Sequence, residues 1–245
     1  MPDLPPILAL DEVDSTNLEA RRQIEAGAVT PLWITAGRQS AGRGRRGRAW
    51  STETGNLAAT LLLHCDKPPI EAAQIAFVTA LAVADLASAF APAGLVSLKW
   101  PNDTLLAGRK LSGILVESGA RAEGGLWLAV GVGVNLAHHP EGTERPATSL
   151  AAHIRRSPPT PLEALALLAE ALERWRGIWD RLGFAPIAQA WTARAHGLGE
   201  ACVARLPGET VQGVAEGLDP DGALRLRLAD GRIRRITAGD VFFGP

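Results

Sequence analysis

The alternation of apolar and polar positions predicts four strands within the first hundred residues. Residues 7–13 (ILALDEV), 32–36 (LWITA) and 56–64 (NLAATLLLH) are short apolar runs, and a fourth short run leads into Lys99. Runs of this length, bounded by polar or turn-forming residues, are typical of β-strands. The segment 37–50, dense in glycine and arginine, is predicted to be a loop.

Helical spacing of apolar residues predicts four helices. Thr16 and Glu19 have the spacing of a capping box, which indicates a helix that begins here and continues to about Gly27. Three further helices are predicted at about 70–90, 161–182 and 186–196. Polar residues interrupt the long apolar segment 70–90, so that we expect a buried helix there and not a membrane span.

Two stretches read as antiparallel β-structure. Residues 104–135 have the pattern of a meander, with turns at 107–109 and 124–125. After residue 198, five short runs alternate with Pro-Gly and Asp-Gly turns, which is typical of a small barrel. We therefore expect an α+β chain with two domains: a mixed-sheet domain over 1–197 and a β-barrel over 198–245.

Composition excludes several classes of protein. The 245 residues are 47% hydrophobic and 21% charged with a net charge of −1, so no global field attracts nucleic acid or an anionic membrane. The two cysteines, Cys65 and Cys202, have no metal-ligand spacing. The N-terminus lacks the pattern of a signal peptide. These features lead us to expect a soluble, cytoplasmic protein without a disulfide framework.

The segment with the clearest candidate chemistry is Gly42-Arg43-Gly44-Arg45-Arg46-Gly47-Arg48-Ala49-Trp50. Its glycines let the backbone approach a ligand closely, and its arginines supply fixed positive charge suited to phosphates or carboxylates. Taken alone, the segment is also compatible with a solvated basic loop or a nucleic-acid patch. It is not a Walker loop, because the Gly-Lys-Ser/Thr sequence is missing.

Three further segments are informative mainly in combination. Lys99-Trp100-Pro101-Asn102-Asp103 can project two polar side chains from a stiff turn, although an ordinary Asn-Asp turn has the same pattern. Lys110 opens the apolar run to Glu117 and can direct an ammonium into a cleft or extend it into water. Glycines alternate in Gly131-Val132-Gly133-Val134-Asn135, which suits a flat ligand against the backbone as well as a packed strand.

In this order, together with Asp14-Ser15-Thr16-Asn17 and Gln39-Ser40-Ala41, these segments resemble the biotin protein ligase family. The resemblance covers about residues 8–245. It implies a class II synthetase-like biotin/lipoate ligase domain with a mixed sheet, followed by an SH3-like barrel. It also implies an enzyme that activates biotin with ATP and Mg²⁺ to biotinyl-5′-AMP, releases pyrophosphate, and transfers biotin to one lysine of a biotin carboxyl carrier protein.

The resemblance also implies roles for individual residues. Ser15, Thr16 and Gln39 would hydrogen-bond the ureido head of biotin, where an unpaired polar group is costly. The resemblance implies that the remaining biotin-binding residues are Asn17, Arg43, Gly44, Arg45, Lys110, Gly113, Leu115, Gly131 and Gly133, and that Arg45, Arg48, Trp50, Asn102 and Asn135 contact the nucleotide.

Catalysis is expected to depend on Lys110, Arg45 and Asp103. Lys110 would contact the biotin carboxylate and the α-phosphate, and Arg45 would belong to a loop that closes over the adenylate. Asp103 would either orient or deprotonate the acceptor lysine or serve Mg²⁺, and the sequence does not separate these roles. Only three of the 25 basic residues are lysines, which makes Lys110 and Lys99 noticeable because arginine does not replace a compact ammonium.

The family also suggests what this chain does not do. Residues 1–7 leave no room for a helix-turn-helix domain, so we expect no operator binding. We expect the protein to be either a monomer or a homodimer. A lipoate ligase or octanoyl transferase is the nearest rival, but its glycine-rich arginine-histidine signature is missing. A nucleic-acid-binding module would leave the lysine and asparagine motifs unexplained, and the net charge disfavours it.

Overall fold

The first half of the chain forms one large mixed sheet in this computed structural model, which describes residues 4–244. Its strands run in the order β1-β2-β3-β7-β6-β5-β4, with β1 and β2 parallel and every other neighbouring pair antiparallel. The strands predicted from the sequence are confirmed, and the second extends to Gln39 because it pairs with the first along its whole length. The bounds are β1 (Ile7–Val13), β2 (Leu32–Gln39), β3 (Leu57–Cys65), β4 (Val96–Lys99), β5 (Asp103–Leu106), β6 (Arg109–Ala120) and β7 (Leu126–Val134).

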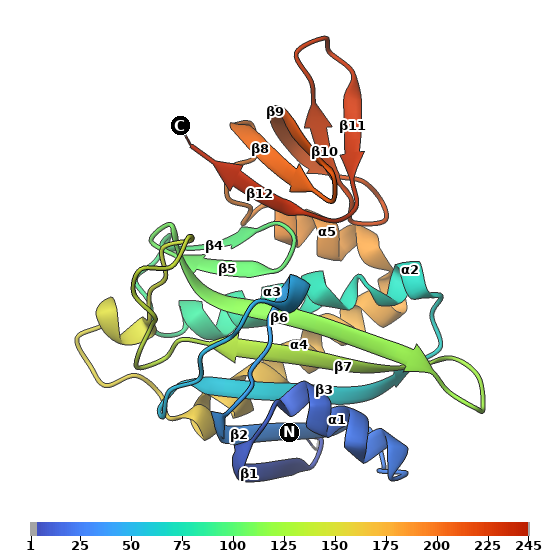
Figure 1. Cartoon of the computed structure of the whole chain (residues 1–245), viewed down its shortest axis with the longest axis vertical. Coiled ribbons are helices and arrows are strands. Elements are labelled where there is room, and N and C mark those ends of the chain that lie inside the picture. Colours follow the sequence, from blue (N-terminus) through green and yellow to red (C-terminus); the bar gives the residue numbers. More distant parts are fainter. Residues whose placement is uncertain (1–3, 245) are drawn as a thin grey trace.

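Helices cover the two faces of this sheet unequally (Figure 1). A single short helix, α1 (Thr16–Glu25), packs on one face, where Ala20, Ile34, Leu62 and Ala129 form a small apolar cluster. The main core lies on the opposite face, under α3 and α4. The remaining helices are α2 (Pro69–Ala72), α3 (Ile75–Ser88), α4 (Pro161–Leu182) and α5 (Phe184–Thr192), with 3₁₀ turns at Arg45–Gly47 and Leu150–Ala152.

Side-chain alternation in β7 connects this layering to the site. Val130, Val132 and Val134 belong to the main core, whereas Ala129 belongs to the cluster under α1. Because successive side chains of a strand point to opposite faces, Gly131 and Gly133 face the α1 side. The sheet is therefore bare of side chains at these two positions, on the face that only one short helix covers.

The predicted capping box at the first helix is wrong. Ser15 is the N-cap residue and its side chain makes no capping hydrogen bond, and the Thr16 hydroxyl is engaged elsewhere, with Gln39 and Thr60. A complete capping box lies instead at the start of α4, where Thr160 and Glu163 bond each other's backbone N–H. The box spacing is therefore present at both helices, but at α1 tertiary contacts take the hydroxyl away from the helix end.

Two predicted helices have different bounds in the structure. The segment predicted at 70–90 is divided into α2 and α3, and tighter hydrogen bonds, such as Phe77 N–H to Gln74 C=O at 2.9 Å, join them. The helix predicted at 186–196 ends at Thr192. The residues after it pair with the edge strand β4, since Leu98 N–H donates to Arg194 C=O and His196 N–H donates to Leu98 C=O.

One helical segment among the described residues, Pro69–Ser88, is long and apolar enough to cross a membrane. However, 72% of its most apolar window is buried inside the fold. The expectation of a core helix agrees with this burial.

The five predicted C-terminal runs form a second, antiparallel sheet, drawn in orange and red in Figure 1. This second sheet packs against the part of the molecule that holds β4 and β5. The buried Trp100, between these two strands, donates its Nε1–H to Gly222 C=O at 3.1 Å. Its last strand begins at Asp240, a buried carboxylate. The order is β11-β10-β9-β8-β12, with bounds β8 (Ala201–Leu206), β9 (Glu209–Leu218), β10 (Leu224–Arg227), β11 (Ile233–Ile236) and β12 (Asp240–Phe243).

Candidate active site

A cavity of about 350 Å³ lies on the α1 side of the large sheet. Its floor includes Gly131 and Gly133, and its rim includes residues 42–50, called here the arginine loop, and the loop that follows β7, residues 135–149. All the site residues predicted from the sequence line it, although they come from five separate segments of the chain. These residues are Ser15, Thr16, Asn17, Gln39, Arg43, Gly44, Arg45, Arg48, Trp50, Asn102, Asp103, Lys110, Gly113, Leu115, Gly131, Gly133 and Asn135.

One end of the cavity is a network of neutral polar groups. Gln39 Oε1 accepts from Thr16 N–H at 2.9 Å, and Gln39 Nε2 donates to Thr52 Oγ1 at 2.9 Å. The buried Thr60 hydroxyl lies 2.8 Å from Thr16 Oγ1 and 2.7 Å from Asn17 Oδ1. Mutual hydrogen bonds fix these side chains, so that this end can recognise a polar, uncharged group. Thr52 and Thr60 were not predicted, because lone threonines in a loop and a strand carry no motif.

An ion pair closes this end on its outer side. Glu117, the last residue of the run that Lys110 opens, accepts from Asn17 Nδ2 at 2.7 Å and lies 3.2 Å from Arg43 Nη2. Gly131 leaves the space for this arrangement, because a Cβ there would collide with the Asn17 side chain. The arginine loop is thus held against the start of α1 through one carboxylate.

The middle of the cavity has an aromatic wall. The Trp50 indole lies over β7, where a Cβ at Gly133 would overlap it. Lys110 Nζ is 5.7 Å from the centre of the same ring system. The ammonium therefore stands beside a flat apolar surface, between the polar end and the charged end of the cavity.

The opposite end is dominated by charge. Asp103, of which 3% is exposed, lies 2.7 Å from Lys110 Nζ through Oδ1 and 3.1 Å from Arg145 Nη1 through Oδ2. Arg45 Nη1 donates to Asn102 Oδ1 at 3.0 Å, and burial lowers the pKa of Arg45. Buried carboxylates and cations neutralise one another here, as desolvated charges require.

The second sheet contributes to this charged end, which the sequence did not predict. Asp240 Oδ1 lies 2.7 Å from Arg145 Nη2 and 2.8 Å from Arg48 Nη2, while its other oxygen lies 3.3 Å from Arg46 Nη1. Burial alone would raise the pKa of Asp240, but hydrogen bonds from Arg48 and Arg145 outweigh it and hold the value at about 2. The arginine loop is therefore anchored at the charged end of the cavity as well.

The predicted nucleotide residue Asn135 has a structural contact. Its Nδ2 donates to Thr148 C=O at 3.0 Å, which fastens the loop after β7 to the sheet. Asn102 Nδ2 likewise donates to Ile114 C=O at 2.6 Å. Both contacts explain why an amide is needed, and the nucleotide roles of these residues stay predictions.

No group of three or more His, Cys, Asp or Glu side chains that could hold a metal ion occurs among residues 4–244. Asp103 is the buried carboxylate that lines the cavity. A Mg²⁺ ion usually keeps several waters and is held by one or two carboxylates plus substrate phosphates. The donor set is compatible with an ion that arrives bound to a nucleotide.

Comparison with known proteins agrees with this geometry. Residues 11–135 match the model of the biotin/lipoate A/B protein ligase family, and residues 197–244 match the biotin protein ligase C-terminal domain. A biotin--[acetyl-CoA-carboxylase] ligase of Paracoccus denitrificans is 45% identical, over 96% of this chain and 99% of that protein. The enzyme of the same name from Mycobacterium tuberculosis is 32% identical, over 94% and 86%.

Solved structures give the same answer. The biotin protein ligase from Aquifex aeolicus in complex with biotin and ATP superposes with a TM-score of 0.82 and 26% identity, over 98% of each chain. The chain therefore belongs to the biotin/lipoate A/B protein ligase family, and within it to the biotin protein ligases.

Proposed function

We propose that this chain joins biotin to ATP and then transfers the biotinyl group to a lysine of a biotin carboxyl carrier protein, such as that of acetyl-CoA carboxylase. The observation that carries the proposal is a single cavity with a neutral polar end, an aromatic middle and a cationic end. Biotin has a ureido head, an apolar ring and chain, and a carboxylate, in the same order. ATP supplies the polyanion for the cationic end.

In this proposal the biotin head binds at the polar end, where Ser15, Thr16 and Gln39 hydrogen-bond the ureido group. The apolar ring and valeryl chain lie against the backbone of β6 and β7. The shape of the floor supports this, because the strand glycines leave room for a flat ligand. The other residues proposed to contact biotin are Asn17, Arg43, Gly44, Gly113, Leu115, Gly131 and Gly133.

The first half-reaction joins two anions. A biotin carboxylate oxygen attacks the α-phosphorus of ATP, and the bond to the β-phosphate oxygen breaks, so that pyrophosphate leaves with the electron pair. Lys110 and Arg45 stabilise the negative charge that develops on the phosphoryl oxygens. Trp50, Asn102, Asn135 and Arg48 position the nucleotide. When bound, Mg²⁺ neutralises phosphate charge, and Asp103 is the residue suited to hold it.

The second half-reaction needs a neutral acceptor amine. Its nitrogen attacks the acyl carbon of biotinyl-5′-AMP, AMP leaves, and the amine proton must be accepted. As the alternative to holding Mg²⁺, Asp103 orients or deprotonates that amine once the ligand engages Lys110. Meanwhile the arginine loop, anchored to Glu117 at one end and Asp240 at the other, keeps water from the mixed anhydride.

The same proposal includes the organisation of the molecule. We divide the chain into a ligase domain over 1–197 and a C-terminal domain over 198–245, and we classify the latter as an SH3-like barrel. Its five antiparallel strands support that classification. We further propose that the enzyme works in the cytoplasm, as a monomer or homodimer.

Substrate choice tests the assignment against a lipoate ligase of the same fold. Release of pyrophosphate from ATP should depend on biotin. It should be at least about 10⁴-fold slower with lipoate or octanoate, because these acids lack the ureido group and leave the polar side chains of the site without hydrogen-bond partners. Comparable rates with lipoate would overturn the biotin assignment.

A further inference from the structure

Arg145 lies outside every motif of the sequence, yet it reaches the centre of the charged end of the cavity. It belongs to the loop after β7 and lines the cavity. Only 15% of its side chain is exposed. An arginine in a loop is normally solvated, so the burial of Arg145 against two carboxylates needs an explanation.

The backbone holds Arg145 in register with Lys110. The neighbouring Pro146 C=O accepts from Lys110 N–H at 2.8 Å, and Thr148 N–H donates to Lys110 C=O at 2.9 Å. Asn135 fastens the same segment from β7. Arg145 therefore lies two residues before a β-bridge between Ala147 and Lys110, the proposed catalytic lysine.

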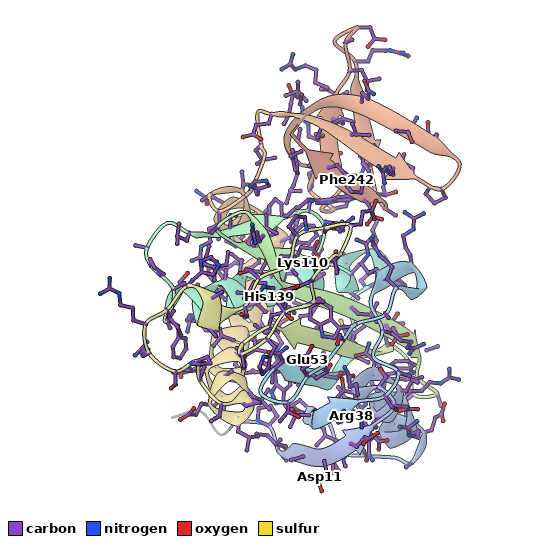
Figure 2. The ribbon with its side chains drawn as sticks, turned by 60° about the vertical axis from the view of Figure 1, so that its left-hand side comes forward. Asp11, Arg38, Glu53, Lys110, His139 and Phe242 are labelled. Atoms are coloured by element: carbon purple, nitrogen blue, oxygen red, sulfur yellow. The ribbon has the colours of Figure 1, made fainter. Side chains whose placement is uncertain are left out.

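The side chain is fixed as firmly as the backbone. Nη1 lies 3.1 Å from Asp103 and Nη2 lies 2.7 Å from Asp240, and the guanidinium carbon is 5.2 Å from the centre of the Phe242 ring. Figure 2 shows Phe242 on the terminal sheet above Lys110. Since a single carboxylate, Asp103, holds both Lys110 and Arg145, the two cations stand side by side at the charged end of the cavity.

This pairing suggests a shared ligand. Lys110 is placed between the polar end and Arg145, and Arg145 stands on the side of Arg46, Arg48 and Asp240. If Lys110 contacts the α-phosphate, the next cation in this direction faces the phosphates beyond it. Arginine suits that position, because its planar fork can bond carboxylate and phosphate oxygens together.

We propose that Arg145 binds the β- and γ-phosphates of ATP and stabilises the departing pyrophosphate. The proposal rests on the proposed function and adds to it a residue that the family motifs do not contain. Asp103 and Asp240 orient the guanidinium beforehand, so that little reorganisation is needed when the polyanion arrives.

The test compares Arg145→Gln and Arg145→Lys with the wild type. For Arg145→Gln we expect the KM for ATP to rise about tenfold or more and single-turnover formation of biotinyl-AMP to slow by roughly 10²-fold, as for the loss of one transition-state contact. The affinity for biotin, measured by calorimetry without ATP, should stay within about twofold. Arg145→Lys should lose part of the ATP affinity, because a point charge does not bond two oxygens in a plane.

Arg205→Gln is the matched control. Arg205 stacks on the same Phe242 ring, 4.2 Å from its centre, and pairs with Glu144, but it does not line the cavity. Its loss should leave the KM for ATP unchanged. The alternative is that Arg145 only holds the two sheets together. In that case both Arg145 variants should unfold at a lower temperature and have an unchanged KM for ATP, and that result overturns the proposal.

The outcomes separate this proposal from the proposed function. A wild-type protein that forms no biotinyl-AMP contradicts the function itself. If wild type forms it and Arg145→Gln binds biotin normally with an unchanged KM for ATP, only the role of Arg145 is wrong. Should Arg145→Gln fail to bind biotin because it misfolds, Arg145→Lys decides by the same measurement.

Discussion

Lys110 is the residue on which the first half-reaction depends most in this account. Its ammonium lies between Trp50 and Asp103, where it can meet both reacting anions. Lys110→Ala should slow single-turnover formation of biotinyl-AMP by roughly 10²–10³-fold, the usual cost of losing a contact to transition-state charge. Lys110→Arg should not restore the rate fully, because a planar fork replaces a point charge.

A second lysine provides the control for this experiment. Lys67 lies over the Trp179 ring at 4.7 Å, away from the cavity, and Lys67→Ala should leave the rate unchanged. Circular dichroism checks the folding of each variant. A Lys110→Ala enzyme within about threefold of the wild-type rate would mean that the ammonium only pairs with Asp103 and does not contact the reacting anions.

The lowered pKa of Asp240 predicts how the free energy of unfolding depends on pH. Its pKa of about 2 lies below the ordinary value of 3.8, so the ionised carboxylate stabilises the folded chain above about pH 4, and this contribution is lost as the pH falls toward 2. Asp240→Asn should lower the free energy of unfolding by about 2 kcal/mol at pH 7, since one pKa unit corresponds to about 1.4 kcal/mol. Urea unfolding at pH 7 and at about pH 3 measures it. A deficit that does not shrink at the lower pH would contradict the ion-pair explanation.

The difference between predicted and unpredicted site residues is one of local context. Residues such as Lys110 and Arg45 stand in segments with unusual glycine, proline or lysine patterns, which set them apart in the sequence. Arg145 is one of many arginines in this chain, and Asp240 stands only as the polar residue before a short apolar run. Their importance arises from contacts between distant segments, which no local pattern contains.

At the scale of elements, the glycines of β7 decide where ligands can lie. A Cβ at Gly131 would displace Asn17, and a Cβ at Gly133 would displace Trp50. Both Gly131→Ala and Gly133→Ala should therefore weaken biotin binding about tenfold, since overpacking typically costs about 1–3 kcal/mol, and Gly133→Ala should in addition raise the KM for ATP because it displaces Trp50. Calorimetry with biotin and initial rates with ATP separate the two. Equal effects of both substitutions on both ligands would show that the strand acts only as a packed core.

The elements themselves were largely predictable, and their ends were not. Strands and helices follow from the period of their apolar residues. The end of α5 and the start of α1 depend instead on residues far along the chain. Strand β4 pairs with residues 194–196 and so ends α5 early. At α1, the Thr16 hydroxyl hydrogen-bonds Gln39 and Thr60 and does not cap the helix. The order of the strands in the large sheet was also beyond local patterns, because β3 pairs with β7 across a long separation.

For the whole molecule, the contacts between the two sheets predict a single unfolding transition. The buried Trp100 bonds Gly222, and Asp240 joins the arginine loop to the loop after β7. Neither sheet keeps its buried polar groups paired without the other. Scanning calorimetry should give one peak with matching calorimetric and van't Hoff enthalpies. Two separate peaks would mean that the sheets are independent and that the terminal sheet does not hold the site.

The central claim is that this chain attaches biotin to a carrier lysine through an adenylate formed in the cavity. The most direct measurement is intact-mass spectrometry of a biotin carboxyl carrier domain after incubation with the protein, biotin and MgATP. The Paracoccus denitrificans relative serves as the positive control for the carrier. We predict one added biotinyl group, on one lysine, only when ATP and biotin are both present. A carrier that the relative modifies and this chain leaves unchanged would contradict it.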